Sequence, residues 1–201
     1  MKRAVWRDGW WLPARRLPSP NFNPRPAGVR VGLAVVHSIS LPPGRYGGDE
    51  VERFFCNRLD HSAHPYFEGL RELRVSAHFF IRRGGRVLQF VSCDERAWHA
   101  GASAWSGREQ CNDYSIGIEL EGLEGGAFEP AQYAALARLL RSAARRYPIE
   151  AVVGHEHIAP GRKADPGPRF DWRALSHRLV GGPRLALQAI DSHRGSSRYE
   201  R

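Results

Sequence analysis

The stretch YSIGIELEG, residues Tyr114–Gly122, alternates between apolar and polar side chains with a period of two. In an extended strand, this alternation places the isoleucines and the leucine on one face, and Glu119 and Glu121 on the other. A carboxylate beside an apolar core is costly, so a cleft is one interpretation of the face that carries Glu119. A solvated outer face is an equal alternative from this stretch alone.

Further strands and helices are predicted on both sides of this strand. Short apolar runs predict strands over 31–37, 75–81, 86–91 and 149–153. Apolar residues recur at helical spacing over 49–59, 130–147 and 171–180. The glycines of RRGG predict a hairpin between the second and third strands. Strands mixed with helices indicate an α/β fold, with a single mixed central β-sheet flanked by helices and long structured loops.

The chain of 201 residues is long enough for one domain with a substantial core. We predict a domain over 1–180, which begins with an irregular lead-in of about thirty residues, and a basic, loosely held tail over 181–201. No apolar run approaches the roughly 20 residues that span a bilayer, and the N-terminus shows no apolar segment of a secretory signal. We therefore expect no membrane partner.

Two whole-chain properties bear on location and partners. Cys56, Cys93 and Cys111 match neither a disulfide framework nor a CxxC zinc site, which predicts reduced thiols in a cytoplasmic protein. The net charge of +9 favours anionic partners, but the arginines are spread along the chain without the aromatic and basic clustering of a nucleic-acid module. A compositional bias towards arginine explains the charge more simply, so we expect no nucleic-acid partner.

The segment GHEHIAPGRKADPGP, Gly154–Pro168, carries the residues most suited to chemistry. Imidazole and carboxylate groups are the usual ligands of a catalytic Zn²⁺, and a nearby lysine stabilises negative charge. His155, Asp165 and Lys163 offer these groups here, and His37 ends an earlier strand. Each has an ordinary alternative as a hydrogen-bonded, turn or surface residue.

His157 competes with His155 as a ligand. In the sequence HEH both rings face the same side if the preceding strand continues, so spacing does not choose between them. His78 is predicted to make structural hydrogen bonds, and the remaining histidines carry little signal.

Several segments, in order from Gly9 to Trp172, resemble a known family. They are RLPSPNFNPRP, LAVVHSISLPPGRYGG, HPYFEGLRELRVSAHFFIRRGGRVLQFV, ERAWHAGASAWSGREQCNDYSIGIELEG and GHEHIAPGRKADPGPRFDW. The family is that of the zinc-dependent N-acetylmuramoyl-L-alanine amidases of type 2, together with the peptidoglycan-recognition proteins.

The resemblance implies a role for each matching residue. It implies three zinc ligands, His37, His155 and Asp165, with Glu119 as the catalytic acid and base and Lys163 as the stabiliser of the oxyanion. It favours His155 over His157, because the family usually has asparagine at the latter position. It also implies a substrate cleft whose residues are Tyr66, Arg74, Trp98 and Ser38. Ser38 and Gln110 depart from the family, whose members often have asparagine and arginine there.

The resemblance further implies zinc-dependent hydrolysis of the amide between 1,6-anhydro-N-acetylmuramic acid and L-alanine of peptidoglycan stem peptides. We expect a monomeric enzyme that takes anhydromuropeptides as small-molecule substrates in cytoplasmic cell-wall recycling. A muropeptide-binding or sensor protein of the same fold without activity is the alternative. The complete set of ligand residues favours the enzyme, and a charge-driven nucleic-acid binder is a third class for which the chain offers no module.

Overall fold

The computed structural model describes residues 5–187, and its centre is a mixed sheet of seven strands. In spatial order these are β13 (Ala186–Leu187), β12 (Ala151–Gly154), β5 (Leu33–Ile39), β11 (Ser115–Glu121), β6 (Phe79–Ile81), β7 (Val87–Gln89) and β3 (Arg15–Arg16). The first five are parallel, β7 is antiparallel to β6, and β3 is parallel to β7. The predicted α/β fold is confirmed, as is the hairpin between β6 and β7.

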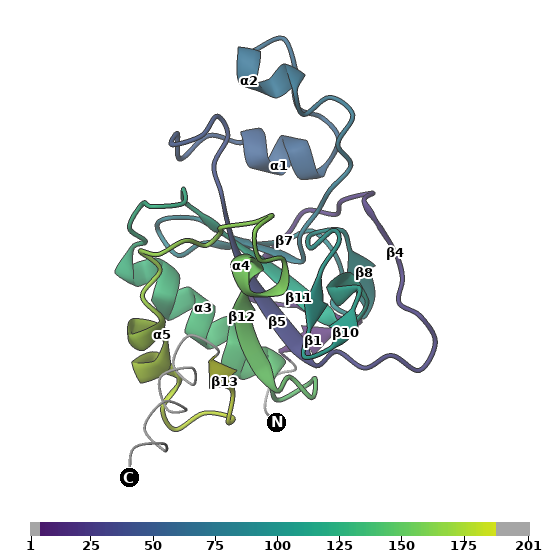
Figure 1. Ribbon diagram of the computed structural model, residues 1–201, viewed down its shortest axis with the longest axis vertical. Helices are drawn as coiled ribbons and strands as arrows, with labels where there is room; N and C mark the ends of the chain where they lie inside the picture. The colour runs from purple at the N-terminus through teal and green to yellow at the C-terminus, as the bar shows by residue number, and fades with distance from the viewer. Residues whose placement is uncertain (1–4, 188–201) are drawn as a thin grey trace.

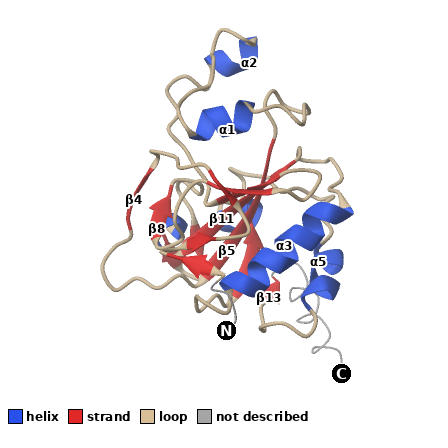
Figure 2. Ribbon diagram, turned by 180° about the vertical axis from the view of Figure 1, so that it is seen from behind, coloured by secondary structure: helices blue, strands red, loops and turns tan. Residues whose placement is uncertain are grey.

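The helices are distributed unevenly around the sheet. α3 (Pro130–Ala143) and α5 (Trp172–Leu179) lie side by side against one face, as Figures 1 and 2 show. α1 (Glu50–Phe55) and α2 (Pro65–Glu68) lie together at the end of the molecule away from β13 (Figure 1). The short α4 (His155–Ile158) directly follows β12, and a 3-10 turn, η1 (Cys111–Asp113), precedes β11.

α3 forms where helical spacing and end signals agree. Pro130 occupies the first turn, where its missing N–H costs no hydrogen bond, and Tyr133, Leu136 and Leu140 form a buried face. The helix ends at Ala143, before the Tyr147 predicted from the apolar spacing. The Asp171 side chain caps α5 by accepting a hydrogen bond from the Ala174 N–H at 2.8 Å.

β11 is buried on both faces because it lies inside a parallel part of the sheet. Its Ile116, Ile118 and Leu120 belong to the main core, which α3 and α5 also line. The solvated outer face considered for the opposite side is wrong. Glu121 is 4% exposed and accepts a hydrogen bond from Arg82 Nη1 at 2.9 Å.

The first thirty residues are more ordered than the irregular lead-in predicted for them. β1 (Trp6–Arg7) and β2 (Trp10–Trp11) form a hairpin, β3 joins the main sheet, and β4 (Phe22–Pro24) pairs with β8 (Glu95–Ala97). A second small hairpin joins β9 (Ala104–Trp105) to β10 (Arg108–Glu109). These strands span two or three residues each, which is too short for alternation to be visible in the sequence.

Two expectations concern the chain ends and membranes. β13 falls within the segment 181–201 that we predicted as a tail, and Leu187 is buried against the core. Residues 188–201 lie outside the described part, so the division into domain and tail stays a prediction. Within residues 5–187, no helix has the length and apolarity that crossing a bilayer requires.

Candidate metal centre and cleft

The candidate site begins at the carboxyl ends of the central parallel strands, where open α/β sheets usually place their ligands. β5 and β11 are neighbours in a register that sets Glu119 opposite His37. Both residues lie on the sheet face opposite α3, since Val35, two positions before His37, packs in a separate cluster, whereas the alternate residues Ile118 and Leu120 of β11 pack in the core that α3 lines. The sheet register therefore brings together residues more than eighty positions apart in the chain.

The third contributing strand does not continue through the HEH sequence. β12 stops at Gly154, and His155 is the first residue of α4. The chain then returns, and the Glu156 N–H donates to the Asp165 carbonyl at 2.9 Å. A Cβ on Gly154 would lie 2.8 Å from Cδ of Pro166, so this close return requires glycine.

His37, His155 and Asp165 meet at one point. Nδ1 of His37 lies 3.0 Å from Nδ1 of His155 and 3.1 Å from Oδ2 of Asp165, and Nδ1 of His155 lies 3.2 Å from Oδ2 of Asp165. Ligands about 2.0–2.1 Å from a tetrahedral Zn²⁺ are separated by about 3.3 Å. Two imidazoles and one carboxylate at this spacing therefore fit zinc, with a fourth position left for water or substrate.

The protonation states of this cluster also suit a cation. Burial lowers the pKa of His37 to about 4, so its ring is neutral at physiological pH. Burial alone would raise the pKa of Asp165, but the close contacts of its carboxylate with the rings of His155 and His37 hold that pKa well below its usual range. Neutral imidazole and ionised carboxylate are the forms that bind metal.

The outer nitrogens of both rings have partners of their own. Nε2 of His155 donates to the Ala100 carbonyl at 3.2 Å, and the same carbonyl accepts from Arg162 Nη2 at 2.6 Å. Nε2 of His37 lies 2.9 Å from Nδ1 of His99. Metal-binding histidines are usually held in this way by a second hydrogen bond. The contact with His99 was missed in the sequence, where nothing but its position in a long loop distinguished that residue.

Glu119, a residue that is 9% exposed, faces this cluster, and its buried Oε2 has no hydrogen-bond partner among the described residues. Burial, reinforced by the charge of Asp165, raises the pKa of Glu119 well above its usual value. Lys163 is exposed at the rim of the same cleft, and its charge opposes that rise. A buried carboxyl group with a raised pKa is a candidate for general acid and base chemistry.

His157 does not join the cluster. α4 is helical, so residues two apart point in nearly opposite directions instead of to the same side. Nδ1 of His157 accepts from the Gly154 N–H at 2.8 Å, and its ring packs 5.7 Å from that of Trp172. The geometry thus separates the two histidines that spacing could not.

A cleft of about 300 Å³ adjoins the cluster. Of the residues expected to bind substrate, Tyr66, Trp98 and Ser38 line it, and Ser38 Oγ is buried without a partner among the described residues. Arg74 is exposed outside the residues that line the cleft, and its Nη1 donates to the carbonyls of Arg71 and Leu73. Gln110 also lies outside that lining, as an exposed residue before η1 with φ of 58°.

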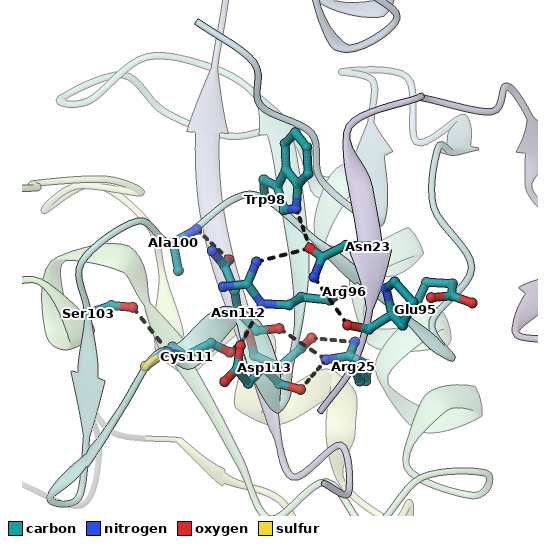
Figure 3. Close-up of polar contacts among 12 residues, drawn as sticks. Asn23, Arg25, Glu95, Arg96, Trp98, Ala100, Ser103, Cys111, Asn112 and Asp113 are labelled. Atoms are coloured by element: carbon teal, nitrogen blue, oxygen red, sulfur yellow. Dashed lines mark hydrogen bonds and ion pairs between the residues drawn. The ribbon is translucent and has the colours of Figure 1, made fainter. Parts of the chain in front are cut away.

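A network of polar contacts holds Trp98 in the cleft wall (Figure 3). Nε1 of Trp98 donates to Oδ1 of Asn23 at 2.6 Å, and Arg96 Nη1 donates to the same oxygen at 3.2 Å. Arg96 also pairs with Asp113, while Arg25 donates to the carbonyls of residues 112 and 113. The N-terminal segment is thereby part of the support of the cleft.

Comparison with known proteins gives consistent matches. Residues 28–168 match the family described as N-acetylmuramoyl-L-alanine amidase. The chain is 53% identical over 167 residues to the 1,6-anhydro-N-acetylmuramyl-L-alanine amidase AmpD of Citrobacter freundii, which covers 82% of this chain and 89% of that protein. Identity to the Escherichia coli K12 amidase of the same name is 52% over 167 residues, or 82% of this chain and 91% of that one.

Solved structures agree with these matches. The crystal structure of a selenomethionine AmpD derivative is similar with a TM-score of 0.85 and 48% identity, covering 88% of this chain and 100% of that chain. A complex of the E. coli amidase AmiD with anhydro-N-acetylmuramic acid-L-Ala-D-γ-Glu-L-Lys is similar with a TM-score of 0.55 and 33% identity, over 78% of this chain and 60% of that chain.

Proposed function

The chain belongs to the N-acetylmuramoyl-L-alanine amidase family, and from this premise we propose that it hydrolyses anhydromuropeptides with the help of Zn²⁺. The bond cleaved is the amide between the lactyl group of 1,6-anhydro-N-acetylmuramic acid and L-alanine. Relatives at about half identity carry this activity in their names, and AmiD has been captured with a substrate of this class.

One observation carries the proposal. Nδ1 of His37, Nδ1 of His155 and Oδ2 of Asp165 lie 3.0 to 3.2 Å from one another, beside the buried carboxyl of Glu119 in an open cleft. Three protein ligands with an open fourth position are typical of catalytic zinc sites, whereas structural sites close all four. Bound there, Zn²⁺ supplies a Lewis acid that polarises the amide carbonyl and lowers the pKa of water towards ~7.

Glu119 transfers the proton in both steps of the reaction. It takes a proton from water as the water oxygen bonds to the amide carbon, and it gives that proton to the nitrogen as the carbon–nitrogen bond breaks. The products are the carboxylate of the anhydro sugar and the free amine of L-alanine. The raised pKa of Glu119 makes its carboxylate a stronger base, which favours the uptake of the proton from water.

Lys163 stabilises the negative charge that develops on the carbonyl oxygen. It lines the cleft near Glu119 and contributes positive charge to the environments of Glu119 and His37. Loss of one such stabilising donor typically costs ~10²–10³ in rate.

The cleft also suits a substrate with apolar and polar parts. Its lining combines apolar and aromatic residues, among them Phe54, Leu70 and Trp98, with the polar groups of Ser38 and of the cluster of His37, His155 and Asp165. We propose that the enzyme acts on soluble wall fragments in the cytoplasm as a monomer. The three free, buried cysteines are consistent with a reducing compartment.

The test combines metal analysis with an amidase assay. We expect purified protein to hold about one zinc per chain, to release peptide from a defined anhydromuropeptide, and to lose this activity with a chelator until zinc is restored. Glu119→Gln, which keeps the shape of the side chain, is expected to hold zinc and to cleave ~10²–10⁴ times more slowly. Full activity in zinc-free protein, or in this variant, contradicts the proposal.

A further inference from the structure

We propose that His99 is a positioning residue, which fixes the tautomer and orientation of the ring of His37 through a directional chain of hydrogen bonds. The chain runs from Nε2 of His37 to Nδ1 of His99 at 2.9 Å and from Nε2 of His99 to Oγ of Ser115 at 3.1 Å. It ends where Oγ of Ser115 meets the carbonyl oxygen of Cys111 at 2.5 Å.

The direction of this chain is set at its far end. The Cys111 carbonyl carries no proton and only accepts, so the Ser115 hydroxyl donates to it. Oγ of Ser115 then accepts from Nε2–H of His99, which leaves Nδ1 of His99 with a lone pair.

The proton position on His99 in turn determines the proton position on His37. Nδ1 of His99 accepts from Nε2–H of His37, so the lone pair of His37 lies on Nδ1. That nitrogen is the one that faces His155 and Asp165. A backbone carbonyl three contacts away thus favours the form of His37 whose Nδ1 is free to bind a metal.

Neighbouring residues hold both the ring and the backbone of His99 in the position that this chain of hydrogen bonds requires. A Cβ on Gly117 would lie 2.4 Å from the ring of His99, so the ring occupies space that only glycine leaves free on β11. Oδ1 of Asn112 accepts from the N–H groups of His99 at 3.0 Å and of Ala100 at 2.9 Å, which fixes the backbone. Asn112 and Ser115 flank the same turn into β11, so one short segment sets both the position and the partner of the ring.

The chain of contacts has an energetic consequence for metal binding. A second hydrogen bond to a histidine ligand reduces the cost of ordering its ring and raises its basicity, and losing one typically weakens metal affinity about 10–100-fold. His37 depends on His99 for this bond, whereas His155 uses the Ala100 carbonyl. Removing the His99 acceptor therefore affects one of the two imidazole ligands and leaves the other supported.

The decisive comparison is between His99→Asn and His99→Leu, whose new side chains have nearly the same shape. Asparagine offers an acceptor near the position of Nδ1, and leucine offers none. We measure zinc affinity by competition with a chromophoric chelator, without substrate, together with the thermal unfolding of each zinc-free variant. His99→Leu is expected to bind zinc about 10–100-fold more weakly than wild type, and His99→Asn to recover most of that loss.

A further variant, Ser115→Ala, and a spectroscopic measurement test the inference even if the His99 variants do not fold. Ser115→Ala removes the hydroxyl that sets the direction while leaving the His99 ring in place. In wild-type protein with nitrogen-labelled histidine, nuclear magnetic resonance is expected to show His99 protonated on Nε2 and not on Nδ1, and Ser115→Ala to mix the two tautomers. The opposite tautomer in wild type overturns the inference.

The inference rests on the proposed zinc site, but different results would contradict the zinc site and the role of His99. Wild-type protein that binds no zinc contradicts the proposed function. Wild-type protein that binds zinc, with His99→Leu and His99→Asn of equal affinity, contradicts the positioning role alone.

Discussion

Glu119→Gln should make the zinc-free protein more stable at neutral pH, although it slows amide cleavage ~10²–10⁴-fold. Glu119 is 9% exposed, and its buried Oε2 has no hydrogen-bond partner among the described residues. A buried, unsatisfied polar group costs about 1–3 kcal/mol, and more when it is charged. The neutral amide of glutamine has nearly the same shape and does not ionise, so we expect the free energy of unfolding at neutral pH to rise by about 1.4 kcal/mol for each unit by which folding raises the pKa of Glu119.

The sign of the pH dependence follows from the raised pKa of Glu119, which is caused by burial first and by Asp165 second. The folded state binds this proton more tightly than the unfolded state, so ionisation of Glu119 opposes folding. The penalty is absent below the unfolded pKa near ~4.3 and grows as pH rises above it. The advantage of Glu119→Gln is therefore expected at pH 7.5 and should shrink towards pH 4.5.

The assay is urea and thermal unfolding of chelator-treated wild type and variant across that pH range. In a chain of this size, 1 kcal/mol corresponds to a Tm change of about 2–4 °C. Glu109→Gln, at an exposed position of β10, is the matched control and should leave Tm unchanged. A variant no more stable than wild type at pH 7.5, or an advantage that persists at pH 4.5, refutes the account of the Glu119 environment.

Three further predictions follow from other contacts. Gly117→Ala places a Cβ 2.4 Å from the His99 ring and is expected to cost about 1–3 kcal/mol in unfolding free energy and to weaken zinc binding. Asn23→Ala removes the acceptor of the Trp98 indole N–H and should raise KM for anhydromuropeptide more than it lowers kcat, as steady-state kinetics would show. Burial and then Arg25 lower the pKa of His78 to about 3. The contribution of its neutral ring to stability is therefore complete above pH ~6.5 and is lost as pH falls towards 3. His78→Asn should reduce the slope of the unfolding free energy against pH by up to ~1.4 kcal/mol per unit in that range.

Each of these has a control or a contrary result. Gly32→Ala is the partner of Gly117→Ala, because a Cβ there meets nothing closer than 3.9 Å, and it should be tolerated. Unchanged KM in Asn23→Ala would show that Trp98 needs no support from the N-terminal segment. Equal pH slopes for wild type and His78→Asn would exclude His78 as the titrating group.

The central sheet could be predicted because its strands are long enough to show their pattern. The alternation of Tyr114–Gly122 places Glu119 on the face opposite the isoleucines, and the structure has it there. Whether that face was solvated or enclosed depended on the residues packed over it, and these come from the loop before β11 and from α4. A single strand carries no information on what covers it.

The candidate site was predictable in its residue types and not in its local geometry. The two histidines of HEH would face the same side only if the preceding strand continued, but the chain turns into α4 at His155, where the return of Asp165 fixes the backbone. That turn depends on a contact between residues ten apart, and it decides which histidine faces the cluster. The tie between them was resolved in the sequence by resemblance alone.

The roles of His99 and of the N-terminal segment could not be predicted from the sequence, for a related reason. His99 acts through the absence of a side chain on Gly117 and through a hydroxyl on Ser115, neither of which has a recognisable spacing from it. The short strand β4 owes its conformation to pairing with β8 instead of to its own pattern. Contacts of this kind are determined by tertiary structure and leave no periodicity to detect.

The most direct test of zinc-dependent amide hydrolysis is mass spectrometry of the products formed from a defined anhydromuropeptide in water enriched in the heavy oxygen isotope. The account predicts a single heavy oxygen in the new carboxylate of 1,6-anhydro-N-acetylmuramic acid, none in the released peptide, and no products in the presence of a chelator until Zn²⁺ is restored. Heavy oxygen in the peptide, or cleavage that continues unchanged without zinc, would contradict it.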